Sequence, residues 1–149
     1  MTDKTTNIEE LKLLLHAFKE ERNWSQFHDA KNLAEAISIE AAELQELFLW
    51  KDSESVMKQI REDANFKCEV EDELADIIAF CINFANATDI DISTAIKSKV
   101  AKNAEKYPVE KARNTATKYT KLWSIASQAR PKTGLLLRIE RLGHLMSTI

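Results

Sequence analysis

The first 107 residues of this 149-residue chain contain neither glycine nor proline, and the whole chain has only two of each. Glycine-rich phosphate loops, dinucleotide-binding turns and tight β-hairpins all depend on glycine or on other residues that accept a positive φ. Those architectures are therefore excluded. The composition predicts an all-α protein whose helices are joined by short connections.

Apolar residues recur at helical spacing in four long segments of the chain. We expect the first helix to begin after Asn7, with Glu10 completing a capping box. A short helix between the second and third long ones is expected to be capped by Ser53 or Ser55. Four long helices of this kind pack as a bundle. The long helices are predicted at about 8–22, 29–50, 66–87 and 94–106, and the short one at 56–61.

Cysteine usage and hydropathy indicate the cellular environment. Cys68 and Cys81 fall in predicted helices without CxxC spacing and are expected to be reduced thiols. The N-terminal segment has no apolar signal region, and the longest apolar run, Ile77–Ile82, is too short to span a bilayer. We therefore expect a soluble, cytoplasmic protein that does not bind membranes.

The net charge of −3 is unevenly distributed along the chain. Residues 1–108 carry 13 Lys or Arg against 22 Asp or Glu, a balance of −9, whereas residues 109–149 carry 8 against 2, a balance of +6. Because binding to nucleic-acid phosphates requires a basic face, the acidic part argues against nucleic acid as the main partner. An acidic part of this kind suits a protein that gathers carboxylates around a metal ion. We expect the basic C-terminal end to dock on the acidic part of the chain.

Two pairs of carboxylates stand at helical spacing. Glu40 and Glu43 are three residues apart in the second long helix, so they project from one face. Glu73 and Asp76 have the same spacing in the third. Antiparallel helices that face each other through these pairs would form an all-oxygen site, which selects hard cations, Mg²⁺ or Mn²⁺, over zinc. Because the pairs lie among core positions, they would repel one another without a cation.

Other interpretations fit part of this pattern. Glutamate-rich helices commonly expose a solvated acidic face, and pairs three residues apart also arise by chance. A di-iron carboxylate bundle looks similar but requires a Glu-x-x-His motif, which none of His16, His28 and His144 supplies. No grouping of serine, cysteine and histidine indicates a nucleophilic triad.

A polar stripe stands in the fourth long helix. Lys99, Asn103 and Lys106 occupy positions i, i+4 and i+7, and Tyr107 follows directly. Such a stripe can hold a polyphosphate, with each lysine acting as a point charge. A solvated helix face has the same spacing, so the pattern alone leaves both interpretations open.

Longer runs of the sequence resemble a known family. The segments ERNWSQFHDAKNLAEAISIEAAELQELFLWK, EDELADIIAF and SKVAKNAEKYP stand in the order found in the all-α nucleoside triphosphate pyrophosphohydrolases of the MazG type. The resemblance covers about residues 8–122 and includes ARNTATKYTKL. Within the family, the chain is most similar to the dCTP pyrophosphatase branch.

The resemblance implies a reaction and a site. The reaction is Mg²⁺-dependent hydrolysis of (deoxy)nucleoside triphosphates, dCTP or related dNTPs, to the monophosphate and pyrophosphate, with Mn²⁺ as a substitute cation. The implied catalytic metal ligands are Glu40, Glu43, Glu73 and Asp76. The implied triphosphate-binding residues are Lys99, Asn103, Lys106 and Tyr107.

The resemblance also implies a base pocket whose aromatic lining includes Trp24 and Trp50. Stacking of a base on such a ring contributes about 1–3 kcal/mol. By position alone, Trp50 would be a core residue, because it ends an apolar stripe.

The sequence departs from the family pattern at three positions. Ile39 precedes Glu40, where MazG proper often has a glutamate pair. A histidine of the dCTP branch aligns with Leu15, His16 being shifted by one, and a tyrosine one turn after the last metal ligand is Phe80 here. The last two changes concern the substrate pocket and therefore the preference for cytosine, not the hydrolysis.

The expected architecture is a four-helix-bundle-like MazG fold assembled into a homo-oligomer. Residues 1–123 would form the MazG-like domain, and residues 124–149 a C-terminal extension without a counterpart in the family. A tetramer is expected rather than a dimer, because the resemblance implies a pocket built from neighbouring subunits and the apolar side chains exceed what one short bundle buries. Those side chains are Leu33, Leu47, Phe48, Phe84 and Ile92.

A second hypothesis belongs to another class. The chain would then be a catalytically silent helical bundle that binds a nucleotide or a partner protein. The four intact carboxylates favour the enzyme, because a silent relative would be free to lose them.

Overall fold

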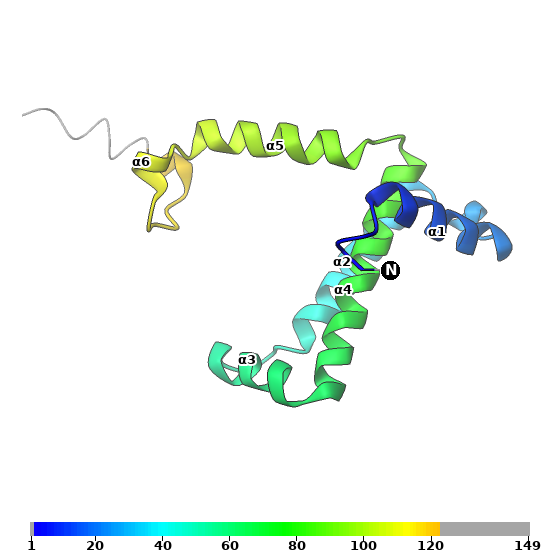
Figure 1. Ribbon diagram of the computed structural model, residues 1–149, viewed down its shortest axis with the longest axis horizontal. Coiled ribbons are helices and arrows are strands. Elements are labelled where there is room, and N and C mark those ends of the chain that lie inside the picture. Colours follow the sequence, from blue (N-terminus) through cyan, green and yellow to red (C-terminus); the bar gives the residue numbers. More distant parts are fainter. Residues whose placement is uncertain (1, 123–149) are drawn as a thin grey trace, which may run out of the picture. The chain divides into compact units, whose positions relative to one another are not determined.

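The computed structural model describes residues 2–122, and over this range it confirms an all-α fold without strands. The predicted extension, residues 124–149, lies outside the described residues. The helices are α1 (Ile8–Glu21), α2 (Ala30–Glu46), α3 (Ser53–Glu62), α4 (Ala64–Ala87), α5 (Ile92–Lys106) and α6 (Val109–Ala112), with a 3₁₀ turn at Ser25–Phe27 (Figure 1).

Over the described residues, the chain divides into two units, one up to residue 95 and the other from residue 96 onward. The division falls one turn into α5, so α1 to α4 belong to the first unit. Among the residues described, no helix combines the length and the apolar character needed to cross a membrane.

The start of α1 confirms the predicted capping box. The Asn7 side chain accepts a hydrogen bond from the Glu10 N–H at 3.0 Å, and the Glu10 carboxylate accepts one from the Asn7 N–H at 3.3 Å. These bonds satisfy two backbone groups that a helix end leaves without partners. The local sequence therefore determines where α1 begins.

The connection between α2 and α3 differs from the prediction. The helix expected to reach Trp50 ends at Glu46, and the following four residues form turns, with Trp50 at a φ of 62°. Asp52, not Ser53 or Ser55, caps α3, because its carboxylate accepts hydrogen bonds from two backbone N–H groups of the first turn. A carboxylate at a helix N-terminus also interacts favourably with the helix dipole.

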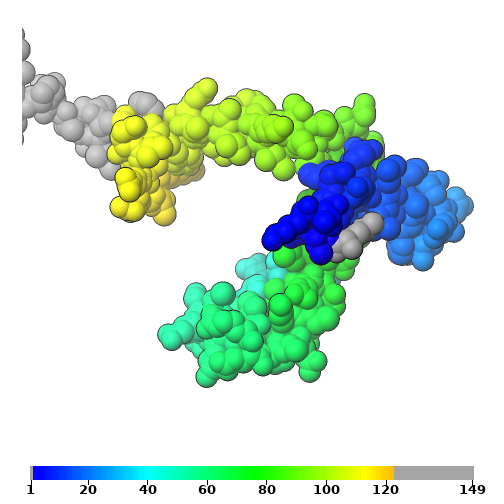
Figure 2. All heavy atoms as spheres, viewed as in Figure 1, coloured from blue at the N-terminus to red at the C-terminus, as the bar shows by residue number. Residues whose placement is uncertain are grey.

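The first unit is organised around α4, which packs against α1, α2 and α3. Helices α2 and α4 lie side by side over most of their length (Figure 1). In the space-filling view, α1 lies at one end of α4 and α3 at the other (Figure 2). The residues buried in this unit include Leu33 of α2 and Phe66, Ile82 and Ala85 of α4.

The large apolar side chains that this unit leaves exposed are not the ones predicted from the sequence. Leu33, expected to exceed the capacity of the bundle, is only 2% exposed, and the other four predicted residues are half-buried. Large apolar side chains of α1, α2 and α4 are exposed instead. They include Leu13, Leu14, Phe18, Ile39, Leu74 and Ile78.

The second unit has its own aromatic contact. Helix α5 ends at Lys106, as expected from the proline two residues later. The rings of Tyr107 and Tyr119 meet edge to face with centroids 6.1 Å apart, and Lys106 Nζ lies 5.3 Å from the Tyr119 ring centroid. Leu122 is buried.

Candidate active site

Three carboxylates from two helices converge in the first unit. Glu40 projects from α2, and Glu73 and Asp76 project from α4, with one carboxylate oxygen of each within 4.8 Å of the others. The spacing of three residues places Glu73 and Asp76 on one face of α4. Packing of α2 on α4 then brings Glu40 to that face.

Glu43 adjoins this cluster without belonging to the group within 4.8 Å. It stands one turn after Glu40 on α2 and is exposed. Its negative charge nevertheless raises the pKa of both Glu40 and Glu73. The structure thus gathers three of the four predicted ligands, with the fourth close enough to act on them electrostatically.

The electrostatics of the cluster favour a cation. Removal from water is the main cause that raises the pKa of Glu40 and of Glu73, and repulsion between the neighbouring carboxylates raises both further. A donor set made only of carboxylate oxygens matches the preference of hard divalent cations such as Mg²⁺ and Mn²⁺. The residues present therefore fit such a metal ion.

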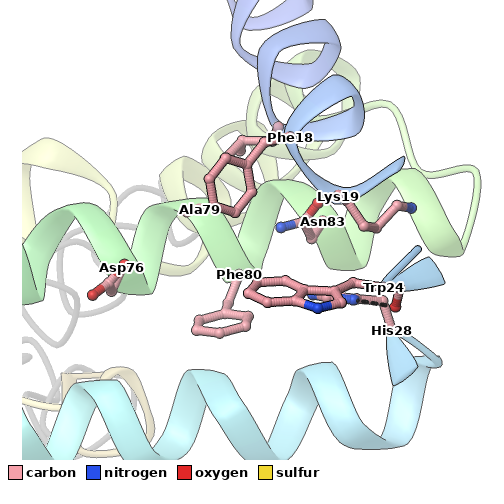
Figure 3. Close-up of a pocket in the computed structure, with 9 residues that line it drawn as sticks. Phe18, Lys19, Trp24, His28, Asp76, Ala79, Phe80 and Asn83 are labelled. Carbon is pink, nitrogen blue, oxygen red and sulfur yellow. Dashed lines mark hydrogen bonds between the residues drawn. The ribbon is translucent and has the colours of Figure 1, made fainter. Parts of the chain in front are cut away.

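A pocket of about 380 Å³ lies beside the cluster (Figure 3). Its walls are mainly aromatic and aliphatic. The Trp24 and His28 rings stack with centroids 6.4 Å apart, and the Phe18 ring meets Trp24 edge to face at 5.9 Å. The residues that line the pocket are Leu15, Phe18, Lys19, Trp24, His28, Asp76, Ala79, Phe80 and Asn83.

The pocket and the carboxylate cluster share Asp76. Four residues of α4 line the pocket at positions i, i+3, i+4 and i+7, namely Asp76, Ala79, Phe80 and Asn83. One face of this helix therefore contributes to both the pocket and the carboxylate cluster. Figure 3 shows Phe80 and the Trp24–His28 pair in the space between α4 and α2. A ligand whose charged part bound at the cluster would thus have an apolar pocket beside it.

Both substituted positions of the predicted substrate site, Leu15 and Phe80, line this pocket. Both side chains are apolar and offer no hydrogen bond to a ligand.

Trp50 is not among the residues that line this pocket. It is 95% exposed, so the interpretation of Trp50 as a core residue is wrong. Helix α2 ends at Glu46, and Trp50 lies in the turn that follows, at a positive φ that no helix residue adopts.

A family model described as MazG-like matches residues 36–122. The chain belongs to the MazG-like family. This match covers the cluster residues and all of α5, and it confirms the expected family. Together with the pyrophosphatase relatives that follow, it also confirms the expected enzyme class, a pyrophosphohydrolase.

Curated relatives of this MazG-like chain include dCTP pyrophosphatase 1 of Rattus norvegicus, which is 34% identical over 115 residues, 77% of this chain and 67% of the relative. The Bos taurus protein of the same name is 35% identical over 115 residues and is covered to 68%. A solved pyrophosphatase structure from Archaeoglobus fulgidus superimposes with a TM-score of 0.64 at 36% identity. It covers 72% of this chain and is itself covered to 98%.

The predicted triphosphate-binding residues of this MazG-like chain lie in its second unit. Lys99, Asn103 and Lys106 belong to α5, so their helical spacing is as predicted, and their side chains are exposed. Tyr107 directly follows the helix and donates its N–H to the Asn103 carbonyl oxygen.

Sequence reasoning missed three polar residues of the pocket, namely Lys19, His28 and Asn83. Lys19 belongs to a charged run that closes α1. His28 lies in the segment between α1 and α2, whose aromatic residues can either pack at the edge of the core or face a ligand. The sequence does contain a feature that distinguishes Asn83, because this polar residue interrupts an apolar run between Ile82 and Phe84.

Proposed function

We propose that this MazG-like enzyme hydrolyses (deoxy)nucleoside triphosphates, dCTP or related dNTPs, to the monophosphate and pyrophosphate, with Mg²⁺ as its cation. The observation that carries this proposal is the shared position of Asp76 in a three-carboxylate cluster and in an apolar, aromatic pocket. Such a pair of features suits a molecule with a polyphosphate at one end and a planar base at the other. The dCTP pyrophosphatase relatives support the same substrate class.

Glu40, Glu73 and Asp76 would hold the metal ion, with Glu43 as a fourth ligand on the strength of the family resemblance. A bound divalent cation neutralises charge on the phosphate oxygens and lowers the pKa of a coordinated water. The convergence of three carboxylates within 4.8 Å supports this assignment, because such a group is unfavourable without a counter-charge.

The chain's own residues would perform the remaining steps. Trp24, which lines the pocket, would stack on the base, and we assign Trp50 to the same base by resemblance. One of the four carboxylates would accept a proton from the attacking water. The side chains assigned to the triphosphate would stabilise the pyrophosphate leaving group. They are Lys99, Asn103, Lys106 and Tyr107.

We also propose that the enzyme is a homo-oligomer, a tetramer rather than a dimer. The large apolar side chains exposed on α1, α2 and α4 support an interface, because patches of this kind usually mark contacts between chains. In this proposal residues 1–123 form the catalytic domain and residues 124–149 an extension. Two free cysteines, Cys68 and Cys81, accord with a cytoplasmic role in nucleotide-pool housekeeping.

The test is a pyrophosphate-release screen over the eight canonical NTPs and dNTPs with Mg²⁺. We expect release from at least one dNTP, its loss on chelation, and its loss in Asp76→Asn. Glu46→Gln provides the matched control, because this exposed carboxylate of α2 lies outside the cluster. Absence of release from all eight substrates would reject the enzyme and favour a silent nucleotide-binding bundle.

A further inference from the structure

Asn83 of α4 is a polar residue in the core of the first unit, only 9% exposed. Its Oδ1 atom is shielded from solvent and has no hydrogen-bond partner among the described residues. A buried amide oxygen without a partner destabilises a fold, and an apolar side chain of similar size would avoid that penalty. Packing alone therefore does not explain an asparagine at this position.

The position of Asn83 connects it with the site. It lines the same pocket as Trp24 and Phe80 (Figure 3). Asp76 and Asn83 are seven residues apart on one face of α4, which corresponds to about 10.5 Å along the helix axis. This distance is comparable with the span of a nucleotide from its phosphates to the edge of its base.

The rest of the pocket offers a base few hydrogen bonds. Leu15, Phe18, Ala79 and Phe80 are apolar and offer none. The Nδ1 atom of His28 is engaged with the Trp24 carbonyl oxygen at 2.7 Å, and it carries the proton because a carbonyl oxygen only accepts. Asn83 is thus a neutral pocket side chain that can present both a donor and an acceptor.

We propose that Asn83 determines base specificity by hydrogen bonding to the edge of a nucleobase held against Trp24, an inference that rests on the proposed function. A half-turn about the Cβ–Cγ bond exchanges the amide oxygen and nitrogen, so either can face the ligand. The recognised group is a planar base whose edge carries a donor next to an acceptor. A site built to pair such an edge rejects bases that leave its polar group unpaired.

The test compares kcat/KM for the four dNTPs and for 1,2-dideoxyribose 5′-triphosphate, which has no base. In the full-length wild type we expect one preferred dNTP. Asn83→Leu is expected to lower kcat/KM for that dNTP about tenfold, the factor expected for one or two neutral hydrogen bonds, and to reduce the preference among bases. The value for the base-free triphosphate is expected to stay unchanged.

Asn86→Leu is the matched control. It is the same substitution one turn later on α4, at a residue that donates to the Lys12 carbonyl oxygen at 3.4 Å and does not line this pocket. Its preference among dNTPs is expected to equal that of the wild type. Asn83→Ala gives the same readout with a smaller side chain if Asn83→Leu does not fold.

Three results would overturn the inference: an unchanged preference in the Asn83 variants, an equal loss with the base-free triphosphate, or a wild type without preference. If the wild type hydrolyses no triphosphate, the proposed function fails separately. Calorimetric titration of wild type and Asn83→Leu with the four deoxynucleosides then decides the role of Asn83. Weaker binding to the variant supports it, and equal or absent binding rejects it.

Discussion

Replacement of Glu40 by glutamine removes one negative charge from the carboxylate cluster and keeps the size of the side chain. In the metal-free protein this charge faces those of Glu73 and Asp76, each with an oxygen within 4.8 Å. Relief of this repulsion is expected to stabilise the fold. Loss of a ligand is expected to weaken the stabilisation by Mg²⁺ at the same time.

The magnitude follows from the distance. Two unit charges 4.8 Å apart repel by about 0.9 kcal/mol at the dielectric constant of water. That value is appropriate because Glu40 is only half-buried and water screens its charge. Two such neighbours give about 2 kcal/mol, or a rise in Tm of about 6 °C for a chain of this size.

The metal-bound state changes in the opposite direction. At a Mg²⁺ concentration 100 times Kd, the wild type gains about 2.7 kcal/mol, whereas a variant with a 100-fold weaker Kd gains about 0.4 kcal/mol. Thermal unfolding of both proteins with chelator and with Mg²⁺ measures the two effects. Glu46→Gln is the control and is expected to show the wild-type response to Mg²⁺.

Two outcomes would refute this reasoning. The first is a metal-free Glu40→Gln protein that unfolds below the wild type, which would mean that the carboxylate makes a stabilising contact. The second is an undiminished gain from Mg²⁺, which would remove Glu40 from the metal site.

Three further predictions concern pH, products and assembly. The difference in Tm between metal-free Glu40→Gln and wild type is expected to be largest near pH 7 and to vanish as the pH falls towards about 4.3, the ordinary pKa of glutamate. The reason is that burial and neighbouring carboxylates raise the pKa of Glu40 in the folded state. The penalty therefore grows as the pH rises above the ordinary pKa and is complete above the raised one, so a constant difference in unfolding scans would contradict it. Chromatography of a dCTP reaction is expected to show dCMP and pyrophosphate from the first time point, and early dCDP with orthophosphate would reject attack at the α-phosphorus. Light scattering is expected to give a multiple of the 17.0 kDa chain mass, and an active monomer would reject the oligomer. Deletion of the residues from Ser124 onward is expected to leave the number of subunits and the activity unchanged.

Much of the helical structure follows from local sequence. The absence of glycine and proline before Pro108 excludes glycine-rich loops and tight β-hairpins, and Asn7 with Glu10 determines where α1 begins. Capping depends on side chains within three residues of a helix end, so it can be read from sequence. The competition among Asp52, Ser53 and Ser55 shows the limit of this method, because adjacent residues of similar capping propensity differ only in their final geometry.

Sequence alone was enough to predict the two carboxylate pairs, because spacing on a helix defines which residues share a face. The packing of α2 on α4 then places Glu40 with Glu73 and Asp76 within 4.8 Å, while Glu43 stays outside that group, and helical spacing does not predict this difference. The tertiary structure alone buried Asn83 beside the pocket without a partner for its oxygen, and it alone exposed Trp50. Burial and pairing are properties of distant segments brought together, and a periodic pattern within one helix does not contain them.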